Sequence, residues 1–559
     1  MVIMVKYRKE VMTIGAAKEA PSWPSWLMAA LGMLWMGLFP LWQDGSYTRI
    51  TRAKWLAMLV LTGVTAAAVI TAAILLLCRG KRRLLRLHPA QLLGLGYLAW
   101  VGLSAGFGSM AGQLNSSGQL TVLWGAVRYE GLLTQSCYVA VFLLMSLIRV
   151  KLRPVLEAAG AAVLICTGVA ALQYTGYNPL GLYPEGLNIR TTMEFQGTIG
   201  NIDILSAWLC LTVPALLAGW MMGRCSSLGL IAGWAGAMMQ LCIEVQSGLI
   251  ALAFMLAALA ALMLIRPEYR SRGFAVLSGV MALLALYLTM EMPWDEGVQT
   301  VTLFAKRSRW ILLPLAAGGA CALLAWIAAK RPGKAVKARW IMAAAAAGFA
   351  LILTAVYSLP MPQNTGLWEL SELLHGRGQD SYGSERLGVW RLTLEMSGDN
   401  LLFGTGPDTF LYALRAHMAA TEQSLKQTFD NPHNMLLAIL SGSGLPALAL
   451  FLALTGVLSA MALRKKECLP LGLGMWGYLV QGMFTFSICL TAPMFWAAMG
   501  MLTSLSGERE ASETVPGCPD AASTAEGAET GSRPRLECCT QAHETPGNAA
   551  VLNERNDEP

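Results

Sequence analysis

Residues 429 to 450, FDNPHNMLLAILSGSGLPALAL, place a histidine among polar residues at the start of a long apolar stretch. Histidine is scarce here, with five in 559 residues, and its side chain can exchange a proton near neutral pH. Asn431 and Pro432 favour a helix start, because Asn caps free amide groups and Pro is tolerated at the first helical position. Neither role explains His433. One explanation is a histidine satisfied by Asn431, Asn434 or a backbone group.

A cation stands at the start of a second predicted helix. The stretch SERLGVWRLTLEMSG predicts an amphipathic helix over residues 385 to 397, with Ser384 as its N-cap. Arg386 then lies in the first turn, where the helix dipole disfavours a cation and favours an anion by about 0.3 to 1 kcal/mol. Free amide groups and a guanidinium together make a phosphate site. The alternative is a solvated Arg386 paired with Glu385 or Asp380.

A second arginine precedes another apolar run. In WGAVRYEGLL, residues 124 to 133, Arg128 and Glu130 stand immediately before the apolar residues. This pair of charged residues is a further candidate for a polar site at the edge of an apolar run. The alternative is an ordinary interfacial belt formed by Trp124, Tyr129 and Arg128.

The remaining polar motifs do not predict a nucleotide or metal site. GTGPDTF, residues 404 to 410, contains Gly-x-Gly but no following Lys-Ser/Thr and no preceding strand, so it predicts a turn leading to a helix near 411 to 420. His375 and His417 show no ligand spacing with His433, and the twelve cysteines are scattered. We therefore expect neither a metal nor another cofactor.

The elements that position these residues should be membrane-spanning helices. Hydrophobic residues make up 55% of the chain and charged residues 13%, with a mean hydropathy of +0.51, whereas soluble domains are roughly a quarter charged. Many of the apolar runs approach the roughly 20 residues that cross the hydrocarbon core as a helix. The sequence thus predicts an all-α polytopic membrane protein with about 12 to 14 transmembrane helices. The expected spans are 26–42, 55–78, 91–108, 131–149, 154–174, 203–222, 228–245, 247–265, 274–292, 310–329, 340–360, 435–462, 469–488 and 491–505.

Basic residues predict the orientation, because short cytoplasmic connections are enriched in Lys and Arg. The connections that should lie inside are RGKRRLLR (79–86), RVKLR (149–153), RPEYRSR (266–272), KRPGKAVKAR (330–339) and RKK (464–466). By alternation, the connections that should lie outside are 43–54, 109–130, 175–202, 293–309 and 361–434. The net charge of +7 then reflects topology, and we do not expect nucleic-acid binding.

This orientation divides the chain into four parts. Residues 1–25 are expected to form a cytoplasmic N-terminal segment and residues 26–505 a multi-span membrane domain. Residues 361–434 form one long extracytoplasmic loop containing short helices. Residues 507–559, rich in Glu, Ala, Ser, Thr, Gly and Pro with few large apolar side chains, have the composition of a disordered cytoplasmic tail.

With these pieces assembled, the sequence resembles the O-antigen ligase/polymerase family of bacterial membrane glycan transferases. The stretches that carry the resemblance are RYEGLL (128–133), GTIGNIDILSAWL (197–209), SERLGVWRLTLEMSGDNLLFGTGPDTF (384–410), PHNMLLAILSGSGLPALA (432–449) and YLVQGMFTFSICLTAPMFWAAMGML (478–502). The similar region covers about residues 95 to 505. One departure is VQSGLIAL (245–252), which lacks the Arg that many members carry in a Ser-Arg-Gly element.

The resemblance implies a GT-C-like fold and a glycosyltransferase whose site faces outside the bacterial cytoplasmic membrane. Members of the family take a glycan from an undecaprenyl-diphosphate carrier and pass it to an acceptor hydroxyl on a glycan, a lipid or a protein. Membrane lipids surround such an enzyme, and neither a nucleotide sugar nor a metal is expected to take part.

The resemblance also implies roles for individual residues. His433 would be the catalytic base that takes the proton of the acceptor hydroxyl. Arg128 and Arg386 would bind the leaving diphosphate, with Arg391 and Asn434 as further substrate-binding candidates.

Two other classes of function remain open at this point. A lipid-linked glycan flippase or another polytopic transporter fits the number of spans, but it gives the long outer loop no purpose. A transporter also usually carries ionisable residues within its spans, and this chain has few. A non-enzymatic glycan-binding membrane protein would use the same arginines and aromatic residues without needing His433.

Overall fold

The computed structural model describes residues 23–80, 87–184, 196–290, 311–331, 333–363 and 365–506. Several predicted segments therefore lie wholly or largely outside the described residues: the N-terminal segment 1–25, most of the basic run 79–86, the connection 293–309 and the tail 507–559.

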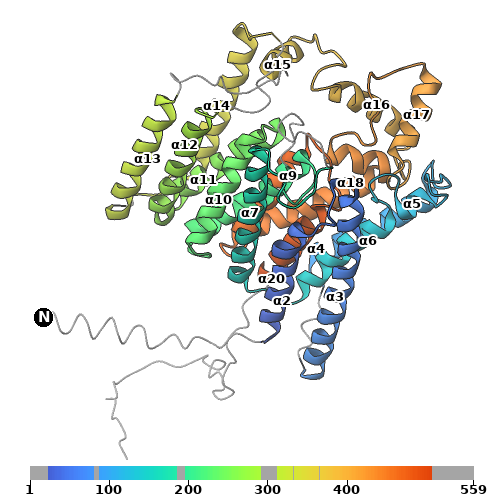
Figure 1. Ribbon diagram of the computed structural model, residues 1–559, viewed down its shortest axis with the longest axis horizontal. Coiled ribbons are helices and arrows are strands. Elements are labelled where there is room, and N and C mark those ends of the chain that lie inside the picture. The colour runs from blue at the N-terminus through green and yellow to red at the C-terminus, as the bar shows by residue number, and fades with distance from the viewer. Residues whose placement is uncertain are drawn as a thin grey trace, which may run out of the picture. The chain divides into compact units, whose positions relative to one another are not determined.

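The described residues form helices and no β-strand, as Figure 1 shows. In chain order the elements are α2 (Trp23–Met33), η1 (Leu34–Leu38), η2 (Phe39–Leu41), η3 (Tyr47–Arg49), α3 (Ile50–Cys78), α4 (Pro89–Phe107), α5 (Thr121–Trp124), α6 (Leu132–Leu147), α7 (Leu152–Tyr174), α9 (Ile202–Met221), α10 (Ser227–Cys242), α11 (Gln246–Ile265), η5 (Pro267–Tyr269), α12 (Arg270–Tyr287), α13 (Leu312–Lys330), α14 (Ala338–Ser358), α15 (Gly366–Leu374), α16 (Arg386–Gly398), α17 (Phe410–Thr421), α18 (Met435–Arg464), α19 (Leu469–Gly482) and α20 (Ala492–Ser506). Each predicted span overlaps one of the helices, so the all-α polytopic class is confirmed.

Fewer helices than expected are long enough to cross a membrane. In the described part of the chain, nine are long and apolar enough by length and composition, namely Trp23–Leu41, Tyr47–Cys78, Pro89–Phe107, Leu152–Tyr174, Ile202–Met221, Gln246–Ile265, Leu312–Lys330, Ala338–Ser358 and Met435–Arg464. By contrast, α6 and α10 have 16 residues each and α20 has 15, whereas a span needs about 20. Every residue of α20 is buried, so its apolar pattern reflects contact with protein.

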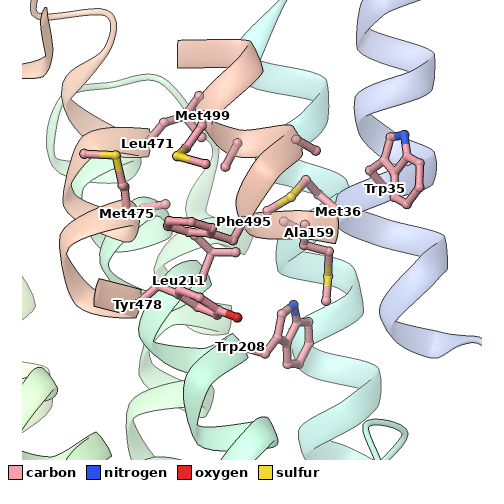
Figure 2. Packing of buried hydrophobic residues seen from close by; sticks show 14 of the residues in the cluster. Trp35, Met36, Ala159, Trp208, Leu211, Leu471, Met475, Tyr478, Phe495 and Met499 are labelled. Atoms are coloured by element: carbon pink, nitrogen blue, oxygen red, sulfur yellow. The ribbon is translucent and has the colours of Figure 1, made fainter. Parts of the chain in front are cut away.

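A continuous apolar core joins helices from both ends of the chain. Figure 2 shows Trp35 of η1, Trp208 of α9, Tyr478 of α19 and Phe495 of α20 among the side chains that pack together. Tyr478 and Phe495 stack with ring centroids 4.5 Å apart. Stacked and tilted rings such as these add about 0.5 to 1.5 kcal/mol each beyond the area that they bury. The N-terminal and C-terminal helices therefore form one packed unit.

Helix α18 is broken within its apolar stretch. Gly444 has φ 79° and ψ 175°, a conformation outside the helical region, and Pro446 follows it. The carbonyl groups of Ser441 and Gly442 accept hydrogen bonds from the backbone amides of Thr405 and Gly406, both at 2.8 Å. The predicted turn at GTGPDTF thus provides the donors that satisfy the break, as exposed backbone at this depth requires.

The first span ends irregularly against a buried lysine. η1 is a π-helix and η2 a 3₁₀-helix that contains Pro40. Lys54 of α3, which is fully buried, donates to the carbonyl oxygens of Phe39 and Pro40 at 3.3 and 2.9 Å. Thr198 Oγ1 donates to the Pro40 carbonyl as well, at 3.0 Å. These donors bind carbonyl groups that an irregular helix end leaves free.

Connections that we assigned to the inside contact one another. Arg149 forms an ion pair with Glu467, and Lys466 lies 3.4 Å from Glu268. Connections that we assigned to the outside likewise meet, because Arg128 pairs with Asp430. The grouping of the connections therefore agrees with the predicted alternation, while the group that faces the outside of the cell stays a prediction.

Candidate active site

Arg386 begins α16, one residue from the predicted start of that helix. The expected N-cap was wrong, because Glu385 occupies the N-cap position in a left-handed conformation with φ 66°. Ser384 is also left-handed, with φ 58°, so its side chain does not cap the helix. The chain turns sharply before α16 and delivers Arg386 at the first helical position.

The carboxylates expected to neutralise Arg386 bind elsewhere. Glu385 accepts from the backbone amides of Lys426 and Gln427, both at 3.2 Å, and Asp380 pairs with Arg391. The Nε of Arg386 is buried and has no hydrogen-bond partner among the described residues. Since buried polar groups are nearly always bonded, a buried guanidinium nitrogen without a partner indicates space for an anion.

His433 lies beside α16 and has an unsatisfied ring. Its backbone is left-handed, with φ 48°, and its amide donates to Asn431 Oδ1 at 2.9 Å. The ring packs edge-on against Phe429 and Phe486, and its Nδ1 is buried without a hydrogen-bond partner in the described structure. Asn431 therefore fixes the turn and leaves the imidazole free. Trp390 of α16 holds this turn by donating to the Pro432 carbonyl at 2.8 Å.

Asn434, and not Asn431 as the sequence had suggested, is the N-cap of α18. The helix begins at Met435, and Asn434 Oδ1 accepts from the amides of Leu436 and Leu437 at 2.9 and 3.1 Å. The expectation that Asn431 and Pro432 start this helix was wrong, because both belong to the turn before it. Asn434 carries the cap, so its side-chain oxygen is occupied.

Arg128 is held in a bidentate pair that the sequence did not suggest. Its Nε and Nη2 donate to the two carboxylate oxygens of Asp430 at 2.6 and 3.1 Å, and its guanidinium lies 3.9 Å from the centroid of the Phe486 ring. These contacts hold the guanidinium plane beside the turn that carries His433. The neighbouring Tyr129 stacks on Trp55. Arg128 therefore does not act simply as a residue of an interfacial belt.

The electrostatics show that His433 and the two arginines are neighbours. Burial, followed by the positive charges of Arg386 and Arg128, lowers the pKa of His433 to about 4, while Asp430 acts in the opposite direction. Asp203, in the first turn of α9, interacts with both arginines. The structure thus brings together His433, Arg128 and Arg386, which lie far apart in the sequence.

Arg391 is not part of this group. Its guanidinium binds Asp380 at 2.7 Å and Glu395 at 2.8 Å, and it donates to Gln423 at 3.0 Å. The side chain is 44% exposed. A guanidinium that is already paired with two carboxylates has little capacity left for a diphosphate.

Two buried carboxyl groups near Arg128 were not assigned roles from the sequence. Burial raises the pKa of Glu130 to about 8 and that of Asp408 to about 6. Asp408 Oδ2 accepts from the amides of Ala126 and Glu130 at 2.7 and 3.0 Å. Glu130 directly follows RY in the sequence, so its place beside Arg128 was a visible signal, whereas Asp408 and Asp430 carry no local one.

Strained backbone gathers at the same place. Of the described residues, seven that are not glycine have left-handed backbone, and five of them flank the site: Tyr129, Ser384, Glu385, Asp408 and His433. Such conformations cost about 1 to 3 kcal/mol each and persist where the surroundings impose them, often at functional sites. The same described residues contain no group of three His, Cys, Asp or Glu side chains that could hold a metal ion.

The segment that departs from the family pattern lies next to the site. Gln246 begins α11, and Gln481 donates to the backbone carbonyl of Asp203 at 3.1 Å and to Ser247 Oγ at 3.4 Å. VQSGLIAL therefore reaches the neighbourhood of Asp203 through Ser247, which shares Gln481 with the Asp203 carbonyl, and it contributes no cation. The guanidinium groups of this site come from Arg128 and Arg386 instead.

One protein-family model matches part of the chain. The family model described as O-Antigen ligase matches residues 297–452, which include α16, the turn at His433 and the first part of α18. Among curated proteins, none matches the chain. Over this region the chain is therefore similar to O-antigen ligases, and its all-helical membrane fold is consistent with that similarity.

Proposed function

We propose that this protein is a glycosyltransferase that moves a glycan from an undecaprenyl-diphosphate carrier to an acceptor hydroxyl at the outer face of the bacterial cytoplasmic membrane. The observation that carries the proposal is the meeting of two guanidinium groups, Arg128 and Arg386, with an imidazole that is neutral at pH 7. A transporter or a glycan-binding protein would need the anion site, but it would have no use for the neutral base.

In the proposed reaction the acceptor oxygen attacks the anomeric carbon and forms the new glycosidic bond. The bond between that carbon and the diphosphate oxygen breaks, and the diphosphate leaves with the electron pair. His433 takes the proton of the acceptor hydroxyl, as a general base does. Arg386, whose Nε is buried and unbonded, and Arg128 bind the charge that develops on the leaving group.

Donor binding would also prepare the base. The positive charges of Arg386 and Arg128 contribute to the low pKa of His433. A bound diphosphate carries opposite charge and offsets these arginines, so the pKa of His433 rises when the donor is present. The imidazole becomes a stronger base when a substrate is there to use it.

The test is transfer by purified protein. The full chain, reconstituted in lipid, is mixed with synthetic undecaprenyl-diphosphate glycans and candidate acceptors, and the released undecaprenyl diphosphate is measured together with the glycosylated acceptor. Stoichiometric formation of both products supports the proposal. Movement of the intact donor between leaflets without cleavage would instead identify a flippase, and saturable binding without cleavage would identify a glycan-binding protein.

A further inference from the structure

A cavity beside Arg128 has no role in the reaction as proposed above. Its volume is about 130 Å³, and Arg128, Glu130, Asp408 and Trp496 are among the residues that line it. A cavity of roughly 150 Å³ accepts benzene. This space therefore fits one six-membered ring, with substituents that project through its opening.

One wall of the cavity is a network built around Glu130. Its Oε1 accepts from Tyr138 Oη at 2.8 Å and from the amide of Cys489 at 2.7 Å. Its Oε2 accepts one long hydrogen bond, of 3.3 Å, from Gln135 Nε2. The Oε1 of Gln135 in turn accepts from Tyr97 Oη at 3.3 Å. One oxygen of Glu130 is thus fixed by short bonds, while the other retains capacity for a ligand.

A second carboxyl group faces the same cavity. The hydrogen bonds that Asp408 accepts, from the amides of Ala126 and Glu130, both fall on Oδ2. Its Oδ1 is therefore available to accept from a ligand. Because burial raises the pKa of Glu130 to about 8, Glu130 holds a proton at neutral pH and can donate as well as accept. Together the two groups match hydroxyls, which both donate and accept.

Aromatic side chains line the cavity next to this network. Trp496 lies with its ring centroid 5.7 Å from that of Tyr97 and 6.3 Å from that of Tyr138, and the latter pair is stacked. Phe451 and Phe495 also line the space. A cavity lined by both aromatic side chains and hydrogen-bonding groups suits a ligand with one apolar face and a polar edge.

We propose that this cavity binds the sugar ring bonded directly to the diphosphate of the donor, with Glu130 and Asp408 binding its hydroxyl groups and Trp496 packing against its C–H face. The inference rests on the proposed function, because it takes Arg128 as a ligand of the diphosphate. A sugar one bond away from that diphosphate would lie next to Arg128, which lines the cavity. An isoprenoid chain in the same space would offer no hydrogen bonds to Glu130 and Asp408, and burying polar groups against an apolar ligand costs free energy.

The experiment separates recognition of the sugar from recognition of the diphosphate. The full chain in lipid is titrated with undecaprenyl diphosphate and with undecaprenyl diphosphate that carries one sugar, drawn from glucose, galactose and their N-acetylated 2-amino forms. The wild type should prefer one sugar-bearing lipid to the sugar-free lipid. Glu130→Gln and Tyr138→Phe should reduce this preference by roughly 10- to 100-fold and leave binding of the sugar-free lipid unchanged.

A matched control is the carboxyl and tyrosine pair formed by Glu244 and Tyr287, which hydrogen-bond to each other and do not line the cavity. Glu244→Gln should keep the full preference. The inference fails if the wild type shows no preference for any sugar, or if Glu130→Gln weakens both lipids equally. A wild type that prefers a sugar-bearing lipid but never cleaves it would refute the glycosyltransferase and leave the sugar site intact. A wild type that binds neither lipid would refute both.

Discussion

At the scale of single residues, the site keeps a histidine neutral where its neighbours are cations. Burial and the charges of Arg386 and Arg128 all act against protonation of His433. A base must be unprotonated before the reaction begins, so this environment suits the proposed role. The same arginines would meet the diphosphate, and one pair of charges therefore serves both the leaving group and the base.

Replacing His433 should separate chemistry from binding. We expect His433→Ala to lower turnover by about 10²- to 10⁴-fold, the usual contribution of a general base. Binding of the lipid-diphosphate donor should be retained, because the arginines remain. Transfer by the purified variant, donor titration and thermal unfolding provide the measurement. Near-normal transfer would eliminate His433 as the base.

The pH dependence of stability should report the same environment. Unfolded His433 binds a proton near pH 6.5, whereas the folded protein binds it only near pH 4. Between these values the unfolded state holds more protons, so the stability contributed by His433 rises with pH. The wild type should therefore lose thermal stability relative to His433→Gln as the pH falls from 7 to about 4.5. A constant difference between the two unfolding temperatures would contradict the depressed pKa.

Substitutions of Arg386 should affect donor binding, whereas His433→Ala should not. We expect Arg386→Ala to weaken donor binding and turnover together, and Arg386→Lys to rescue little, because a point charge does not reproduce the planar guanidinium. Arg377 provides the control, since it forms an exposed pair with Glu372 and Arg377→Ala should leave transfer unchanged. Full activity of Arg386→Lys would show that only a positive charge is needed there.

Local patterns in the sequence singled out candidate residues but not their partners. Arg128, Arg386 and His433 each stand at the edge of an apolar or amphipathic stretch, and their roles in a site stay a prediction. The pairing of Arg128 with Asp430 joins residues 302 positions apart, and no local pattern carries that information. Asp380, which was considered as a partner of Arg386, binds Arg391 instead.

At the scale of elements, the break in α18 depends on one glycine. Gly444 occupies a region of φ and ψ that is essentially limited to glycine. A Cβ added there would lie 2.1 Å from the carbonyl oxygen of Leu402. Position 444 therefore requires glycine for two reasons: its backbone conformation, and the lack of space for a Cβ.

Gly444→Ala should therefore destabilise the protein. The backbone conformation alone costs about 1 to 3 kcal/mol for a residue with a side chain, and the overlap with Leu402 adds to it. Gly456→Ala in the same helix is the control, since a Cβ there meets nothing within 4 Å. Thermal unfolding of both variants in the same lipid provides the comparison. Equal unfolding temperatures would show that the break is not required.

Helices were easier to predict than their irregularities. The apolar pattern of residues 435 to 462 predicted one continuous span, and the helix is present with nearly these bounds. The pattern could not reveal that Gly444 leaves the helical conformation, because the donors come from the turn at Thr405 and Gly406. The cap of α9, by contrast, is a local interaction, because Asn201 Oδ1 accepts from the amides of Asp203 and Ile204.

At the scale of the whole molecule, sidedness determines whether the site can meet an extracytoplasmic substrate. Val336, in the connection before α14, contacts the last turn of α11, since its amide donates to the Leu264 carbonyl at 2.9 Å. α15, α16 and α17 belong instead to the long loop 361–434. The predicted orientation assigns these two regions to opposite sides.

Labelling of introduced cysteines tests this orientation. Cysteines at Gln363 and Thr421 should react with an impermeant thiol reagent in intact cells, whereas a cysteine at Ala335 should react only after the cells are opened. Only cysteine variants that retain transfer activity are compared, because their fold is intact. The reverse pattern would move the site to the cytoplasmic face and refute the proposed reaction.

The break in α18 also constrains how the chain can be made. A ribosome delivers residues 404 to 406 before residues 441 to 444, so the donors for the broken helix have been synthesised when that helix inserts. The carbonyls of Ser441 and Gly442 can be satisfied as soon as the turn docks. Completion of α18 and the docking of the preceding loop should therefore be one step of biogenesis, and a chain that starts at Met435 would insert this helix without its partners.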